Sequence, residues 1–356
     1  MSRLSATVAG LVALSVPTTL LAAPPLFGVM FRTGGQTAGL YPNLYDINPS
    51  TGAATNPRPV NVNNTVGLAI DPVTGIMYGL TDQLGRINNQ TGLAGKNLLF
   101  TIDPVSGFAT GVGTITPSAG PLQVFEGDLA FSPTDGQLYA TRSLNGVGTL
   151  LRIDIHTPAN SVAIGDINAP NFDASAMAFA PNGDLYVLNT TIPAATTTPA
   201  QLFKINPANA QVLQSWQLDL AIGTVAGMAF HPDSGDLLVV DGDFAGLNQM
   251  FRVDFANSAL APIGATGAAG GNYQGLAGLA FGYVRDPLWA VAVFGAPGAA
   301  FPRRRGGCPW RHMKFRRGDV PPRPPAGVLR SACRPRSPSG RRYTPRSRVV
   351  NSASNL

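Results

Sequence analysis

One hydrophobic pattern recurs five times along the chain. In each copy large apolar residues flank an alanine, and the copies occupy residues 67–70, 128–131, 176–179, 227–230 and 278–281. Apolar positions that alternate with period two are typical of a β-strand, and they place the alanine on the face opposite its large neighbours. We therefore predict five equivalent strands whose small alanine faces a crowded neighbour, as in the innermost strand of a repetitive fold.

A second pattern interleaves with the first. It ends in isoleucine or valine followed by aspartate or asparagine, at residues 44–48, 99–103, 150–154, 202–206 and 250–254. Turns with an early proline and a late glycine follow both patterns, as in residues 71–75 and 103–107. Proline presets φ at about −65° and glycine tolerates positive φ, so these turns predict tight hairpins. The next strands are expected at 76–80, 137–141, 184–188 and 236–240.

Four short strands per repeat, joined by hairpins, predict one blade of a β-propeller. The fifth copy of the first pattern, at 278–281, has no partner strand after it, whereas residues 26–29 resemble residues 77–80 and have no strand before them. We therefore predict an all-β fold, a single β-propeller of five four-stranded blades, whose last blade is closed by N-terminal strands. An open solenoid and a β-sandwich are the alternatives, but complementary fragments at the two ends favour a ring.

Longer and more variable connections are expected on the face opposite the tight turns. They comprise residues 32–41, 82–97, 143–148, 190–200 and 242–248 within blades, and 61–66, 116–126, 166–175, 218–226 and 265–277 between blades. Loop variation on a rigid scaffold is where binding usually resides. Any functional site is therefore predicted on this face.

Charge and composition divide the chain into unlike regions. Residues 302–356 contain 14 arginines, Lys314 and Asp319, which gives +14 and leaves −8 for the rest of the net +6. The N-terminus, with Arg3, an apolar stretch and small residues at 21–23, is typical of a secretory signal, although an uncleaved anchor has the same pattern. We expect a signal peptide at 1–23, the propeller at 24–283, an anchor-like segment at 284–305 and a disordered Arg/Pro-rich tail at 306–356.

Two motifs carry a family resemblance. Residues 128–139 approach Gly-Leu-Ala-Phe-x-Pro-x-x-Gly-x-Leu-Tyr, and residues 99–107 read Leu-Phe-x-Ile-Asp-Pro-x-x-Gly. They resemble bacterial secreted propellers of the YVTN and NHL-like kind, closest to a group of unknown function often exported with a PEP-CTERM sorting tail. The resemblance implies an exported extracellular, cell-surface or periplasmic protein. It implies no substrate, because these motifs consist of turn and core residues.

The C-terminal region departs from that family. Residues 284–287 lack the glutamate and first proline of the sorting motif, and the apolar run at 288–301 is shorter than the roughly 20 residues a membrane span needs. The basic residues that follow are interpreted as a frame-change product, a solvated tail or, third, a polyanion-binding segment. Both cysteines, Cys308 and Cys333, lie there, so the predicted propeller contains no disulfide.

Candidate chemistry is sparse. Glu126, the single glutamate, precedes an inner strand, and Asn64 and Asp173 occupy nearby points of neighbouring repeats. We interpret these three residues as solvated loop positions; as the alternative, they resemble the carboxylate and amide ligands with which propeller lactonases hold Ca²⁺. No catalytic, nucleotide, zinc or phosphate motif is present in the sequence.

The sequence therefore favours an exported non-enzymatic propeller. Its function is expected to be binding of a ligand or partner, such as an extracellular polysaccharide or protein, or a role in an extracellular matrix or surface layer. Specific nucleic-acid binding is not expected of an exported protein, and no cofactor is predicted. The alternative is a Ca²⁺-dependent lactonase or hydrolase with its metal at the mouth of the central channel.

Overall fold

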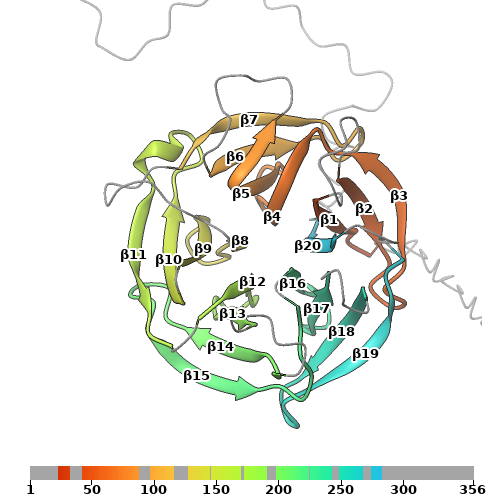
Figure 1. Cartoon of the computed structure of the whole chain (residues 1–356), viewed down its shortest axis with the longest axis vertical. Helices are drawn as coiled ribbons and strands as arrows, with labels where there is room; N and C mark the ends of the chain where they lie inside the picture. The colour runs from red at the N-terminus through yellow and green to blue at the C-terminus, as the bar shows by residue number, and fades with distance from the viewer. Residues whose placement is uncertain are drawn as a thin grey trace, which may run out of the picture. The chain divides into compact units, whose positions relative to one another are not determined.

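The structure, a computed structural model, describes residues 23–32, 42–87, 97–115, 127–144, 146–169, 172–190, 198–223, 225–242, 248–267 and 274–282. These residues form twenty β-strands and one short 3-10 helix, η1 (Pro158–Asn160). The strands make five antiparallel four-stranded sheets arranged around one axis (Figure 1). The protein is an all-β, five-bladed β-propeller, which confirms the predicted fold class.

The blades are numbered in chain order, each from its innermost strand outward. Blade 1 consists of β20 (Gln274–Phe281), β1 (Leu26–Arg32), β2 (Asn43–Ile47) and β3 (Ala54–Pro59). Blade 2 consists of β4 (Val62–Ile70), β5 (Met77–Ile87), β6 (Leu98–Ile102) and β7 (Ala109–Thr114). Blade 3 consists of β8 (Leu129–Phe131), β9 (Leu138–Leu144), β10 (Val147–Ile153) and β11 (Val162–Ile167).

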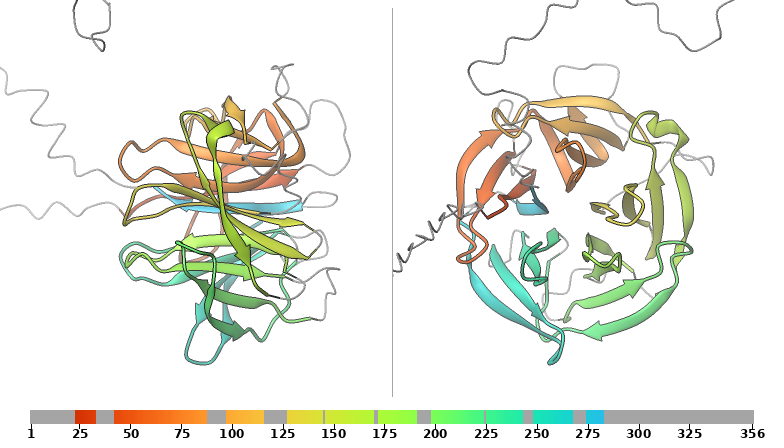
Figure 2. Two further views of the ribbon diagram at one scale, coloured as in Figure 1. Left: turned by 90° about the vertical axis from the view of Figure 1, so that its left-hand side faces the viewer. Right: turned by 180° about the vertical axis from the view of Figure 1, so that it is seen from behind.

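The remaining two blades follow the same plan. Blade 4 consists of β12 (Ala174–Phe179), β13 (Leu185–Asn189), β14 (Gln201–Ile205) and β15 (Val212–Gln217). Blade 5 consists of β16 (Ala226–Phe230), β17 (Leu237–Asp241), β18 (Gln249–Asp254) and β19 (Ala259–Ala265). Figure 2 shows the ring edge-on and from behind.

The two ends of the propeller sequence meet in blade 1. Leu26 of β1 pairs with Phe281 of β20, and the pairing continues to Arg32 and Gln274 with one irregularity. Beyond the strands, the Gly282 amide donates a 2.7 Å hydrogen bond to the carbonyl oxygen of Pro25. The predicted closure by N-terminal strands is therefore confirmed, and no inner-strand edge is left open in this blade.

The hydrophobic core is divided among five seams, by which we mean the spaces between neighbouring blades. Side chains of the two facing sheets form one cluster in each seam. The inner-strand alanine faces the following blade, so that Ala69 of blade 2 packs in one cluster with Leu129 and Leu138 of blade 3. Burial of a leucine side chain contributes about 1.5–3 kcal/mol, so these seams supply the main stabilisation of the ring.

Near the axis the inner strands lie almost in backbone contact. A Cβ added to Gly67 would lie 2.8 Å from the Cα of Asp128, and one added to Gly278 would lie 2.7 Å from the nitrogen of Leu68. Glycine is needed at these positions because no larger residue leaves room for the neighbouring strand. The centre of the ring is thus narrow at this level.

The hairpins of one face are built alike. A side-chain acceptor at the first turn position receives backbone N–H groups two and three residues later, as from Val73 and Thr74 to Asp71 and from His156 and Thr157 to Asp154. The late glycine has positive φ, for example +73° at Gly75. We call this end of the ring the turn face, and its hairpins match the sequence prediction.

We call the opposite end of the ring the loop face. There, two segments that were predicted to be connections form part of strands. Residues 61–66 were expected to form a connection, but β4 begins at Val62 and pairs with an extended β5 through irregular register. Residues 143–148 were also expected to form a variable loop, yet only positions 145 and 146 separate β9 from β10. Cross-strand pairing extends further because apolar residues such as Val62 and Ile87 continue the core there.

Candidate functional site

Buried polar side chains gather at the loop-face ends of the inner and second strands. They include Asn64, Thr65, Thr81, Asp82, Asp128, Thr141, Asp173, Ser175, Asn189, Thr190 and Asp241. A buried polar group costs free energy unless it is hydrogen-bonded. Their concentration at one end of the ring marks the loop face as the candidate site.

Asn64 lies in the irregular part of β4. Its φ of +55° is in the left-handed region that asparagine tolerates, and its side chain is buried. The amide Nδ2 donates a 2.8 Å hydrogen bond to Oδ2 of Asp82 on β5. The interpretation of Asn64 as a solvated loop residue is wrong, because strand extension draws it under the loop face.

Asp173 is fully buried where the chain enters β12. Its backbone amide donates to Oδ1 of Asn189 at 2.6 Å, and Thr190 Oγ1 donates to its carboxylate at 3.5 Å. Thr190 also shares a 2.6 Å hydrogen bond with Ser175 Oγ. The solvated interpretation is thus wrong for Asp173 too: its side chain belongs to a polar network that ties the two inner strands of blade 4 together.

Two of the three candidate calcium ligands lie within the described residues, and they belong to different blades. Asn64 belongs to blade 2 and Asp173 to blade 4, and each bonds within its own blade. Glu126 lies outside the described residues. Within the described ranges, no group of three or more His, Cys, Asp or Glu side chains is placed to hold a metal ion.

Asp128, a carboxylate that was not among the predicted site residues, lies between the inner strands of blades 2, 3 and 4. Its Oδ1 accepts backbone N–H groups from Leu129 at 2.7 Å and from Leu68 of blade 2 at 3.3 Å, and its Oδ2 accepts the amide of Met177 of blade 4 at 2.9 Å. One side chain therefore joins three blades. Desolvation by burial raises the pKa of Asp128 well above its usual value, although the three N–H donors act in the opposite direction.

The signal for Asp128 was present in the repeat. The other four blades carry Gly67, Ala176, Gly227 and Gly278 at this point of the first pattern. An acid at a position otherwise taken by the two smallest residues indicates a partner from outside its own repeat. Sequence alone could not name that partner, because the N–H donors lie in other blades.

In blade 5, too, hydrogen bonds hold the residues at which the loop-face connections begin and end, which we call the loop roots. Asp241 is buried at the end of β17, and its Oδ1 accepts the amide of Gly223, which precedes β16, at 3.3 Å. The carbonyl oxygen of Gly242 accepts a 2.5 Å hydrogen bond from the Gly275 amide of blade 1. Variable connections therefore start from fixed points on several blades.

The two histidines of the described residues lie on the turn face, away from these networks. Nδ1 of His231 accepts the amides of Asp233 and Ser234 at 3.3 Å each, the role that aspartate fills in other turns. His156 follows Asp154 and donates its backbone amide to that carboxylate. The backbone and side-chain hydrogen bonds of both histidines thus belong to turns.

Part of the chain matches a known sequence family. Residues 127–285 match the family described as "Repeat of unknown function (DUF6923)". This region covers blades 3, 4 and 5 and the inner strand of blade 1. A comparison with curated protein sequences finds no significant match. The chain is thus a five-bladed β-propeller, part of which is similar to this repeat family.

Several solved structures are similar at low identity. A protein of unknown function from Dyadobacter fermentans DSM 18053 has 12% identity and a TM-score of 0.43, with coverage of 69% of this chain and 84% of its own. TolB from Acinetobacter baumannii has 14% identity and a TM-score of 0.41, with coverage of 67% and 52%. An engineered GH43 glycoside hydrolase has 10% identity and a TM-score of 0.40, with coverage of 58% and 39%.

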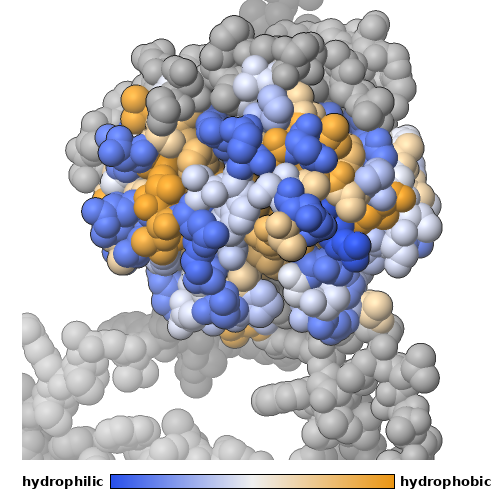
Figure 3. Space-filling model, turned by 90° about the horizontal axis from the view of Figure 1, so that it is seen from below, coloured by the Kyte–Doolittle hydropathy of each residue, from blue (hydrophilic) through white to orange (hydrophobic). Residues whose placement is uncertain are grey.

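The matched region thus spans about half of the TolB chain and two fifths of the glycoside hydrolase chain. The function proposed below rests on this chain's own residues. Within the described residues, no helix has the length and apolar character that crossing a bilayer requires. On the side of the ring that Figure 3 shows, hydrophilic and hydrophobic residues are interspersed.

Proposed function

We propose that this protein is an exported, non-enzymatic β-propeller that binds an extracellular partner through its loop face. Export is supported by the signal-like N-terminus, where Arg3 precedes an apolar stretch. The partner class that we propose is an extracellular polysaccharide. Sequence-variable connections with few catalytic groups suit recognition of a repetitive polymer better than a chemical step.

The observation that carries this proposal is the difference between the two faces. Turn-face acceptors such as Asp71, Asp103 and Asp254 bond to backbone within their own turns, so that face is chemically repetitive. On the loop face, the anchoring groups differ between blades: Asp82 bonds to Asn64 in blade 2, and Asp241 bonds to the amide of Gly223 in blade 5. Rigid and individually different loop roots are what a specific binding surface requires.

The test compares binding before and after loop replacement. The full chain is applied to an array of purified alginate, dextran, cellulose and xylan, alongside a variant with residues 191–197 and 243–247 replaced by Gly-Ser linkers. The matched control replaces the turn at residues 103–108 by the sequence of residues 48–53. We expect the full chain to bind at least one polysaccharide saturably. The affinity is expected to fall at least tenfold in the loop variant and to be retained in the turn control, with the melting temperature unchanged.

Absence of binding to every polysaccharide, or equal loss in the loop and turn variants, would overturn the proposal. The same protein separates it from the lactonase alternative. Calorimetric titration with CaCl₂ is expected to give no saturable heat, because Asn64 and Asp173 already bond to protein groups. Tight one-site Ca²⁺ binding that disappears in Glu126→Ala would favour the metal-dependent enzyme instead.

A further inference from the structure

One position of the repeat places an aromatic side chain in most seams of the propeller. On each second strand, one residue pairs with the inner-strand alanine and faces the next blade. In blades 1 to 4 this residue is aromatic: Phe27, Tyr78, Tyr139 and Tyr186. In blade 5 it is Leu238, opposite Ala229. The seam between blades 5 and 1 therefore lacks one aromatic ring.

In three seams the tyrosine stacks on an aromatic residue of the next blade. The ring centroids are 5.7 Å apart for Tyr78 and Phe131, and 5.2 Å apart for Tyr139 and Phe179. In the seam between blades 4 and 5, Tyr186 contacts Phe230 at 5.3 Å and two further aromatic rings, Trp216 and Phe255. Aromatic pairs at such distances are favourable, so the ring is part of how a seam is filled.

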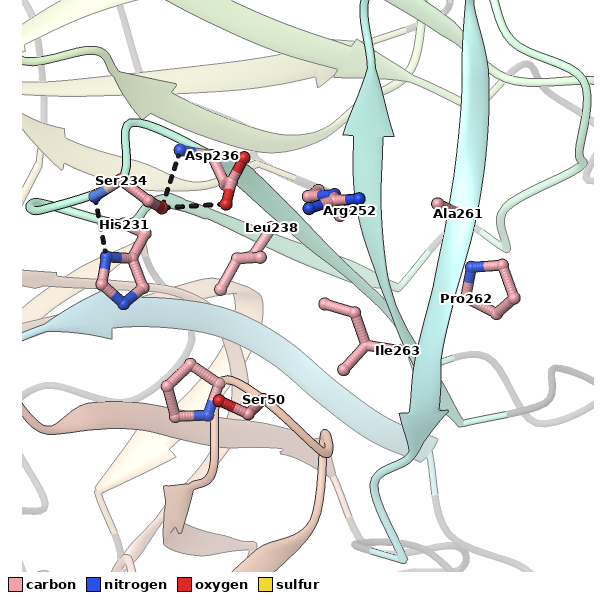
Figure 4. A pocket seen from close by; sticks show the side chains of 10 residues that line it. Ser50, His231, Ser234, Asp236, Leu238, Arg252, Ala261, Pro262 and Ile263 are labelled. Carbon is pink, nitrogen blue, oxygen red and sulfur yellow. Dashed lines mark hydrogen bonds between the residues drawn. The ribbon is translucent and has the colours of Figure 1, made fainter.

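The seam between blades 5 and 1 holds a pocket where this ring is missing. The pocket has a volume of about 370 Å³, and Figure 4 shows Leu238 and Ile263 at its apolar wall, with Ser50 of blade 1 on the other side. The aromatic partner from blade 1 is retained: Phe281 is buried in the same seam as Leu238, and His231 contacts its ring edge-on at 5.0 Å. This volume is at the lower end of the range for small-molecule sites, about 300–1,000 Å³.

The two charged groups that flank the tyrosine of blade 4 have counterparts in blade 5. In blade 4, Asp184 lies two residues before Tyr186, and Lys204 is the cross-strand partner of that tyrosine. Asp184 and Lys204 form a 2.6 Å ion pair beside the tyrosine ring. In blade 5, Asp236 lies two residues before Leu238, and Arg252 pairs with Leu238. Both side chains line the pocket (Figure 4).

Blade 3 shows how a phenol hydroxyl is held at this end of a seam. Tyr139 donates a 2.8 Å hydrogen bond to Oδ2 of Asp135, four residues earlier. In blade 5 the residue four before Leu238 is Ser234, whose Oγ donates to Oδ2 of Asp236 at 2.9 Å. The pocket is therefore lined by an acceptor for a phenol hydroxyl, Asp236, and by a cation, Arg252, whereas blade 5 has leucine in place of the tyrosine.

We propose that the pocket between blades 5 and 1 binds a phenol group from another molecule, with the ring over Leu238 beside Phe281 and the hydroxyl between Asp236 and Arg252. This site lies on the turn face, so it is separate from the loop-face function proposed above. The phenol is either a free small molecule or the side chain of an exposed tyrosine. Both present the same group that Tyr78, Tyr139 and Tyr186 supply within the chain.

The test is titration of the full chain with p-cresol, followed by NMR or calorimetry. We expect saturable one-site binding that is at least tenfold weaker for toluene, because toluene leaves the acid and the cation without the hydroxyl. Leu238→Tyr, which restores the repeat, is expected to abolish binding and to raise the melting temperature. The peptide acetyl-Gly-Tyr-Gly-amide distinguishes the sources: tighter binding than p-cresol assigns a tyrosine, and weaker binding assigns a free phenol.

A matched control keeps the proposal falsifiable. Val105→Tyr adds the same side chain at an exposed turn of blade 2 and is expected to leave p-cresol binding unchanged. If Leu238→Tyr fails to fold, Ile263→Trp fills the same pocket from β19 and is expected to abolish binding. No saturable binding of p-cresol by the parent chain, or undiminished binding in a folded pocket-filling variant, would overturn the proposal.

Discussion

At the scale of single residues, Asp128 has the most unusual environment. Its carboxylate is fully buried at the axis and accepts N–H groups from three blades. Burial raises the pKa of this carboxyl above the value of about 3.9 that it has in the unfolded chain. Between these two values the folded state binds a proton that the unfolded state has released. The contribution of Asp128 to stability therefore falls as the pH rises from about 4 through the folded pKa.

This linkage predicts a pH-dependent effect of Asp128→Gly, which introduces the residue found in three other blades. We expect the stability of the parent chain relative to the variant to fall as the pH rises above about 4, by at most about 1.4 kcal/mol per pH unit. Urea unfolding of both proteins at several pH values measures the difference. Parallel pH profiles of the two proteins would contradict the assignment.

Local sequence chemistry predicted the turns better than it predicted the site. The acceptor, proline and glycine of residues 71–75 act within five residues, so their hydrogen bonds follow from the sequence alone. Asn64 and Asp173 were interpreted as solvated, but their burial depends on strand extension and on partners such as Asp82 and Asn189. The sequence does show a leucine, Leu238, at the repeat position where the other four blades have an aromatic residue. That this leucine borders a pocket follows only from the packing of blade 5 against blade 1.

At the scale of secondary-structure elements, neighbouring inner strands lie so close together that only small residues fit at some of their positions. Period-two alternation located all five inner strands, because each buries one apolar face in a seam. It did not locate the ends of β4 or the short connection from β9 to β10, where pairing continues through less regular sequence. Ends depend on cross-strand partners, whereas the existence of a strand depends on its own pattern.

The close approach of β20 and β4 predicts a specific cost for Gly278→Ala. The new Cβ would lie 2.7 Å from the Leu68 nitrogen and 3.0 Å from the Gly67 carbonyl carbon, which are backbone atoms with no rotamer to change. We expect a loss of about 1–3 kcal/mol in denaturant unfolding, as for other overpacked sites.

Gly113→Ala on the outer strand β7 is the matched control. There the nearest atom to an added Cβ is Cδ of Pro158, at 3.3 Å, so the substitution is expected to cost clearly less. Similar losses for the two variants would show that the axis is not the tighter site.

At the scale of the whole molecule, the ring depends on blade 1. Removal of residues 26–48 deletes β1 and β2 and exposes both seams that blade 1 shares with blades 2 and 5. We expect this deletion to abolish the cooperative thermal transition of the entire propeller, measured by calorimetry. The reason is that the ring can no longer close and blades 2 and 5 each lose a neighbouring sheet. A melt near that of the parent chain would contradict the role of closure.

Deletion of residues 306–356 is the control for that experiment. The sequence predicts that this arginine-rich segment, which lies outside the described residues, is not part of the propeller, so its removal is expected to leave the melting temperature unchanged. A large drop in melting temperature would show that the segment contributes to the propeller.

The pairing of Leu26 with Phe281 also fixes the order of events during synthesis. The first strand of the propeller to leave the ribosome is β1, and the strand that completes its sheet is the last. Blade 1 therefore cannot form before the chain has been made through Phe281, and such long-range pairing is slow to nucleate. Until then, a nascent chain lacks the inner strand of blade 1 and with it the closure of the ring.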